Sequence, residues 1–113
     1  MMETSPLELF PDRDNYGTNA LNTFLRACLS SVRSDLRNAA LYALFAYHAG
    51  NLLESYHQTP LPASVSDSDY ELFYSLIEKG KASLRGSDSE RLVAINQIAA
   101  ADFFDEHDTK GSK

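Results

Sequence analysis

The sequence predicts an all-α protein, a compact helical bundle of three to four helices with an extended N-terminal strap. Three observations lead to this prediction. Apolar residues recur at helical spacing over long stretches, and no stretch shows sustained strand alternation. Residues 18–49 contain neither glycine nor proline. The sequence Ser-Asp-Ser occurs at 66–68 and again at 87–89, and both copies have the composition of a helix start.

The 113 residues are expected to form a single domain, 1–113. A chain of this length buries roughly two-thirds of its unfolded surface, which is enough for one core. Residues 1–15 are predicted to form the strap, because two prolines accompany three large apolar side chains there: Pro6, Leu7, Leu9, Phe10 and Pro11. Residues 105–113 are predicted to form a polar flexible tail.

Residues 18–57 permit two interpretations. The apolar phase continues without a slip from Leu21 to Ala46, which favours one helix of about 40 residues, near 60 Å at 1.5 Å per residue. The size of the domain favours a break near Ser34-Asp35 instead. Serine can cap a new helix, and aspartate favours its first turn. The sequence alone leaves both interpretations open.

The stretch 38–53 carries no charge over 16 positions, and we expect it to be the central core helix. It is too short and too polar to span a membrane, which needs roughly 20 predominantly apolar residues. Small residues recur along one side, which predicts close approach of a neighbouring helix and a disruptive effect of Ala43→Leu. These residues are Ala39, Ala43, Ala46 and Gly50.

The second half of the chain has clear helix boundaries. Pro60 and Pro62 are expected to end the core helix. Two pairs have the spacing of a capping box and predict helix starts, Ser68 with Glu71 and Ser87 with Glu90. Between them, Gly80 is expected to shorten or kink the helix and Gly86 to stop it.

Composition limits the classes of function. A net charge of −6 opposes nonspecific binding to nucleic acid or to an anionic membrane, because both require positive charge. The single cysteine, Cys28, excludes an intrachain disulfide and fits a reducing compartment. The N-terminus has no basic and apolar segments of a secretory signal. We therefore expect a cytoplasmic protein.

Metal sites and cofactors are not expected. Glu54 and His57 have the Glu-x-x-His spacing of di-iron bundles, but no second such pair supplies the remaining ligands. Residues 12–17 imitate the start of a calcium loop, although Thr23 stands where the bidentate glutamate is required. These residues are interpreted as a polar turn before a helix that starts near Thr18.

No catalytic constellation is recognised, so the prediction is a protein that is not an enzyme. Cys28 lies on the apolar phase of its helix and is expected in the core. His48 is predicted to be buried and bonded to a tyrosine hydroxyl or a carbonyl; the alternative is a ligand pocket or active site formed by His48 and Tyr47.

The favoured function is that of an inhibitor, immunity protein, adaptor or subunit of a larger assembly, which binds a protein partner. The acidic charge favours a partner with a basic surface, and a homodimer is the other option. The expected interface contains two tyrosines among acids: Tyr70, Tyr74, Asp67, Asp69 and Glu71. A second alternative is nucleic-acid regulation through Arg26, Arg33 and Arg37, which share one side if their helix is continuous.

Overall fold

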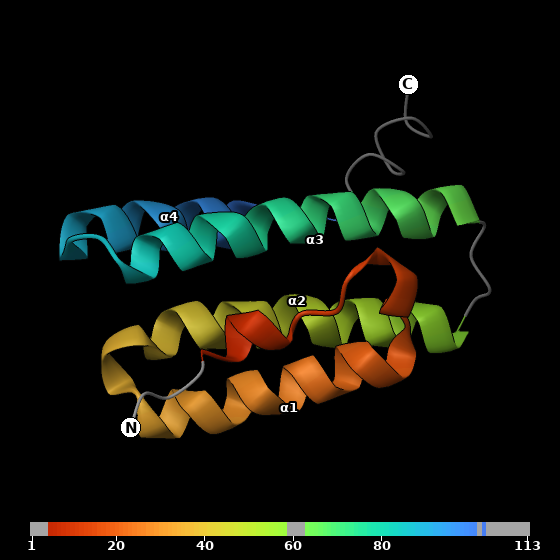
Figure 1. Ribbon diagram of the computed structural model, residues 1–113, viewed down its shortest axis with the longest axis horizontal. Helices are drawn as coiled ribbons and strands as arrows, with labels where there is room; N and C mark the ends of the chain where they lie inside the picture. The colour runs from red at the N-terminus through yellow and green to blue at the C-terminus, as the bar shows by residue number, and fades with distance from the viewer. Residues whose placement is uncertain (1–4, 59–62, 102, 104–113) are drawn as a thin grey trace.

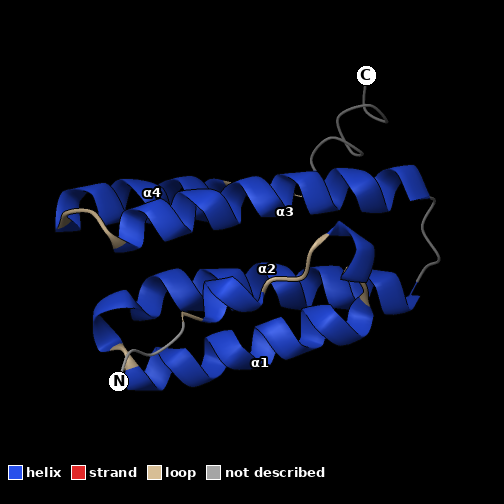
Figure 2. Ribbon diagram, viewed as in Figure 1, coloured by secondary structure: helices blue, strands red, loops and turns tan. Residues whose placement is uncertain are grey.

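The computed structural model describes residues 5–58, 63–101 and 103. These residues form four α-helices: α1 Thr18–Ser34, α2 Ala39–Gln58, α3 Ala63–Leu84 and α4 Asp88–Ala100. The same described residues form three 3₁₀-helices: η1 Pro6–Leu9, η2 Arg13–Asn15 and η3 Leu36–Asn38. The described residues contain no strand (Figure 2), and the prediction of an all-α helical bundle is confirmed.

The helices form two antiparallel hairpins, α1–α2 and α3–α4, which stack as two layers (Figure 1). The contact between the layers differs from one side to the other. On one side α2 packs directly against α4, whereas on the other side η1 lies between the layers and contacts both α1 and α3. The N-terminal segment therefore acts as a spacer in the bundle, and its two 3₁₀ turns replace the extended strap that the sequence predicted.

The long first helix is broken at Asp35, so the interpretation with two helices is right. Asp35 leaves helical geometry at φ −136° and ψ 80°, while its N–H still donates to the Ser31 carbonyl. Its carboxylate accepts a hydrogen bond of 2.9 Å from the side chain of Asn38. Aspartate competes with helical backbone pairing in this way, and the chain reverses within η3.

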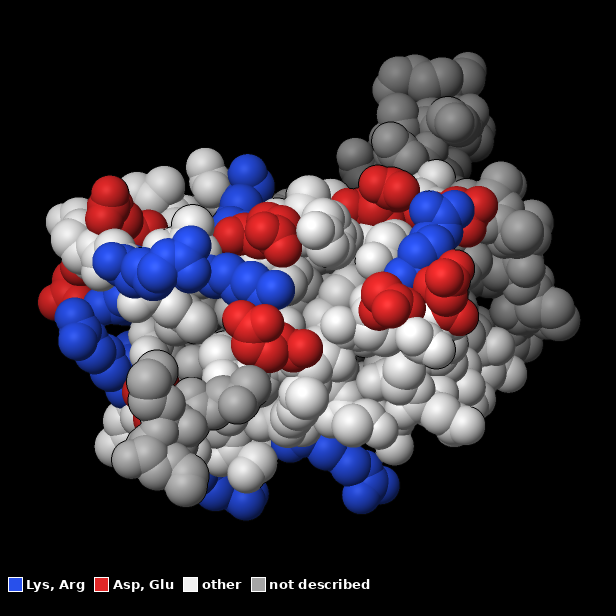
Figure 3. All heavy atoms as spheres, in the orientation of Figure 1, with Lys and Arg blue, Asp and Glu red and all other residues white. Residues whose placement is uncertain are grey.

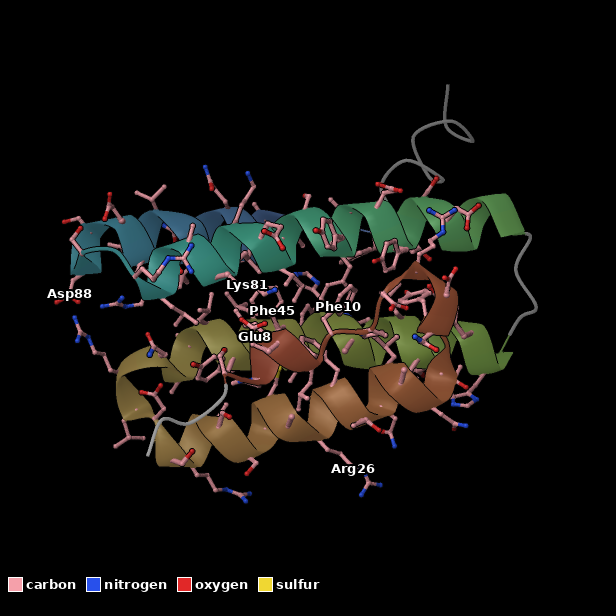
Figure 4. The ribbon with its side chains drawn as sticks, in the orientation of Figure 1. Glu8, Phe10, Arg26, Phe45, Lys81 and Asp88 are labelled. Carbon is pink, nitrogen blue, oxygen red and sulfur yellow. The ribbon has the colours of Figure 1, made fainter. Side chains whose placement is uncertain are left out.

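Phenylalanine rings fill the space between the layers. Phe24, Phe45 and Phe73 come from α1, α2 and α3, and all three are completely buried. Their ring centroids lie 5.7–6.3 Å apart. Phe10 adds a fourth ring from the N-terminal segment, 4.8 Å from Phe73 and 5.4 Å from Phe24 (Figure 4).

Gly80 lies inside α3, which continues to Leu84, so the expectation that this glycine shortens the helix is wrong. A Cβ atom at Gly80 would lie 2.9 Å from Cε2 of Phe45 and 3.1 Å from Cδ1 of Leu7. Both distances are shorter than ordinary van der Waals contact. The glycine is therefore required by the close approach of the Phe45 ring and of the N-terminal segment to α3.

The stripe of small residues on α2 faces its neighbours only in part, because Ala46 is buried in the core and Gly50 faces Leu25 of α1. Ala43 is exposed, so the expectation that Ala43→Leu disrupts packing is wrong. A Cβ atom at Gly50 would make only ordinary contact, 3.5 Å from Cδ1 of Leu25. Within the described residues, no helix combines the length and apolarity needed to cross a bilayer.

The two predicted capping boxes have different outcomes. Ser87 and Glu90 form the expected box at the start of α4: Ser87 Oγ accepts from the Glu90 N–H, and the Glu90 carboxylate accepts from the Ser87 N–H. The predicted box at Ser68 is wrong, because α3 already begins at Ala63 and Ser68 lies within it. The predicted stop at 59–62 and tail at 105–113 lie outside the described residues.

Replacement of Gly80 by alanine should destabilise the protein. The new methyl group must displace the Phe45 ring, and overpacking of this kind costs about 1–3 kcal/mol, against a gain in helix propensity of about 1 kcal/mol. Gly50→Ala, the matched control in α2, should be neutral or slightly stabilising. Urea unfolding of both variants measures the difference. Equal stability of the two would contradict the close approach at Gly80.

Candidate protein-interaction surface

The interface predicted around Tyr70 is only partly on the surface. Tyr70 is 8% exposed and Asp69 is 4% exposed, so neither side chain is available to a partner, which corrects that prediction. The Tyr70 ring stacks on Phe10 at 5.7 Å and meets Tyr16 edge-on at 5.3 Å. This tyrosine therefore holds the N-terminal segment against α3, while Tyr74, one turn further on, is 46% exposed.

The two exposed acids of the predicted interface pair with the N-terminal segment. Arg13 lies 2.8 Å from the carboxylate of Asp67 and 3.1 Å from that of Glu71. Its guanidinium also lies 5.7 Å from the centre of the Tyr70 ring. All three charged side chains are about half exposed or more, so solvent weakens these ion pairs. Asp67 and Glu71 remain accessible on the outer face of α3.

A partly buried polar network lies beneath the ion pairs of Arg13, and the sequence did not reveal it. The hydroxyl groups of Tyr16 and Tyr56 lie 2.8 Å apart, and Tyr56 donates to the carboxylate of Asp69 at 2.9 Å. Burial raises the pKa of Tyr16 to about 12, and burial with the Tyr16 hydrogen bond raises that of Tyr56. The position of Tyr56 on an apolar stripe indicated that its hydroxyl needs a partner, but not which one.

The outer face of α4 is an uncharged helical surface beyond the first turn of the helix. No charged residue occurs from Leu92 to Ala101. The helix buries only a narrow inner strip, consisting of Arg91, Ala94 and Ile98. Leu92 and Val93 are 58% and 56% exposed. Asn96 and Gln97 are exposed on the same helix, so the apolar part of this candidate interaction surface consists of Leu92 and Val93.

Grooves run along both sides of α4. The groove between α3 and α4 has a volume of about 360 Å³ and is lined by Lys79, Ala82, Ser83, Glu90, Val93, Ala94 and Gln97. The hollow on the other side has a volume of about 280 Å³ and is lined by Arg37, Asp88, Arg91, Leu92 and Ile95. The exposed apolar side chains of α4 thus stand between two hollows, each wide enough for side chains of a partner.

A charged cluster positions the start of α4. The buried Arg91 donates to the Ser83 carbonyl near the end of α3 at 3.1 Å and to Asp88 at 2.6 Å. Arg37 reaches the same Asp88 oxygen at 3.0 Å and so links the two hairpins. Hydrogen bonds from Arg37 and Arg91 lower the pKa of Asp88 below its ordinary value. The cluster keeps Leu92 and Val93 in a defined orientation.

His48 and Tyr47 line a pocket of about 280 Å³ at the end of α4, together with Asn51, Ala99, Ala100, Ala101 and Phe103. His48 is buried, and its Nε2 lies 2.8 Å from the Ile98 carbonyl. A carbonyl only accepts, so Nε2 carries the hydrogen and donates it. The predicted bond of a buried histidine to a carbonyl is confirmed.

The remaining candidate residues, Cys28 and residues 12–17, have structural roles. Cys28 is completely buried, and burial raises the pKa of its thiol to about 12, which leaves it unreactive at neutral pH. Asp12 caps η2 by accepting from the Asn15 N–H at 3.0 Å, so residues 12–17 form the expected polar turn. The described residues contain no group of three His, Cys, Asp or Glu side chains placed to hold a metal ion.

The three arginines of the alternative nucleic-acid site do not share one continuous helix. Arg26 and Arg33 lie on α1, whereas Arg37 lies beyond the break, in η3, and pairs with Asp88. The geometry assumed for that stripe is therefore absent.

Comparison with protein-family models, with curated proteins and with solved structures found no significant match.

Tyr56→Phe should destabilise the protein by about 1–3 kcal/mol, because Asp69 loses a buried hydrogen bond. In the native protein, Tyr16 keeps its proton to about pH 12, while an unfolded tyrosine releases it near pH 10. Stability should therefore be complete below pH 10 and fall as the pH rises further. Urea unfolding at pH 8 to 11 should show a shallower decline for Tyr56→Phe. An equally steep decline would contradict the network.

Proposed function

We propose that this chain is a noncatalytic helical protein that binds a protein partner through the outer face of α4. The observation that carries the proposal is the exposure of Leu92 and Val93 on a helix face without charge, in a protein whose net charge is −6. The partner segment that fits is an amphipathic helix. Its apolar side chains would enter the groove between α3 and α4, where Ala82 and Ala94 leave room.

The chemistry of the nucleophile candidate supports a noncatalytic role. The Cys28 thiol is completely buried, and burial raises its pKa to about 12. His48 uses Nε2 for a main-chain carbonyl at the end of α4. Inhibitors, adaptors and assembly subunits all act by such noncatalytic binding, and the α4 surface does not distinguish among them.

Val93→Glu should abolish partner binding without unfolding the protein, because a carboxylate would have to be desolvated in the apolar contact. Tagged wild-type protein, Val93→Glu and Ala43→Glu would be used to capture proteins from an extract of the cells that express this chain. Ala43 is exposed on α2, so the control adds the same charge elsewhere. We expect one stoichiometric protein with wild type and Ala43→Glu, and at least tenfold less with Val93→Glu.

Two results would contradict the proposal. Equal capture by Val93→Glu would show that α4 is not the binding surface. Empty capture by the wild-type protein would argue against protein binding as the function.

A second candidate function is binding of a small molecule in the pocket beside His48. The specific observation is its polar wall, where Tyr47, His48 and Asn51 come from successive turns of α2. Native mass spectrometry of protein purified from its own cells should then show an added mass. Asn51→Leu, which removes a polar wall group, should reduce that added mass, and a bare wild-type protein would argue against this candidate.

A further inference from the structure

The outer face of α1 carries positive charge, and the described residues supply no acid that pairs with it. Arg26 and Arg33 are exposed, and neither guanidinium has a carboxylate partner among the described residues. Arg26 points away from the bundle (Figure 4), and basic side chains project from an otherwise uncharged surface along the α1 edge (Figure 3). Between them Leu29 is 49% exposed. These three residues form the basic stripe.

The outer face of α3 carries the complementary pattern. Glu71 and Glu78 are exposed and seven residues apart, and the half-exposed Tyr74 lies between them. Residues at this spacing lie on one side of a helix, two turns apart. Figure 3 shows acidic side chains over α3, next to the basic side chains with which some of them pair. Glu71, Tyr74 and Glu78 form the acidic stripe.

We propose that the basic stripe of one copy of this chain binds the acidic stripe of another. Arg26 and Arg33 are also seven residues apart, so both charge pairs are about 10.5 Å apart along their helices. In a parallel register Arg26 meets Glu71, and Arg33 meets Glu78. Leu29 and Tyr74 each follow the first charge of their stripe by three residues, so they meet between the ion pairs.

Glu71 and Glu78 can form this contact, because each cation that pairs with them has a second carboxylate partner. Arg13 lies near Glu71 but retains Asp67 at 2.8 Å. Lys81 lies 3.8 Å from Glu78 but retains Glu8 at 3.6 Å (Figure 4). Glu71 and Glu78 can therefore turn to a second copy without leaving a cation of their own chain unpaired.

The contact is heterologous, because the two stripes lie on different helices of each copy. Such head-to-tail contacts produce rings or open chains. Two ion pairs and one apolar contact make a small interface, so we expect reversible assembly at high protein concentration. The contact uses α1 and α3, and it is independent of the α4 surface.

Charge reversal tests the proposal. Arg26→Glu/Arg33→Glu changes the net charge from −6 to −10, and Glu71→Arg/Glu78→Arg changes it to −2, because each reversal alters the charge by two. Sedimentation velocity would be measured from micromolar to millimolar protein. We expect wild-type mass to rise with concentration, each variant to associate at least tenfold more weakly, and an equimolar mixture of both variants to associate again.

The variant of charge −2 is an internal control. If net charge governed association, this variant would associate more strongly than wild type, and that result would overturn the proposal. Wild-type protein that stays monomeric throughout, or a mixture of variants that stays monomeric, would also overturn it. Leu29→Asp provides a second variant should either double variant fail to show a native circular dichroism spectrum, and it should weaken association as well.

Discussion

The insertion of Phe10 and Leu7 between the two hairpins is the contact on which the bundle depends. Direct helix packing joins the layers between α2 and α4, whereas η1 lies between α1 and α3, which also meet through the rings of Phe24 and Phe73. Phe10 touches rings of both layers, Phe24 of α1 and Phe73 of α3. Leu7 also approaches α3 closely, because a Cβ atom at Gly80 would lie 3.1 Å from its Cδ1. The N-terminal segment thereby joins the side chains of the two hairpins in one hydrophobic core.

The surface of α3 follows from the same insertion. Because the N-terminal segment lies beside α3, Tyr70 is used to hold Phe10 and Tyr16, and Asp69 is used to accept from Tyr56. Only Tyr74 and the exposed acids remain for other molecules. The five residues of the predicted interface therefore have two roles. Asp69 and Tyr70 are buried and structural, whereas Asp67, Glu71 and Tyr74 lie on an outer face that a second molecule can reach.

The sequence predicted the elements better than their contacts. Helical periodicity and the Ser87–Glu90 capping box depend on local chemistry, so they could be found without a structure. The small residues of α2 led to a wrong prediction for Ala43, because this residue is small but exposed. Gly80 was expected to shorten or kink its helix, because glycine has a low helix propensity. In the structure it instead leaves space for the ring of Phe45, which lies 35 positions earlier in the chain. Contacts at such separation leave no local signal.

The candidate surfaces show the same limit. The absence of charge from Leu92 to Ala101 is visible in the sequence, but an uncharged helix is equally consistent with burial. Only the structure shows that α4 buries one narrow strip and leaves Leu92 and Val93 exposed. Likewise, arginines of an acidic protein are expected to pair with its own acids. Arg37 does so, whereas Arg26 and Arg33 lie on a helix that contains no acid. The location of charge, more than its net value, determines which faces of this protein can bind.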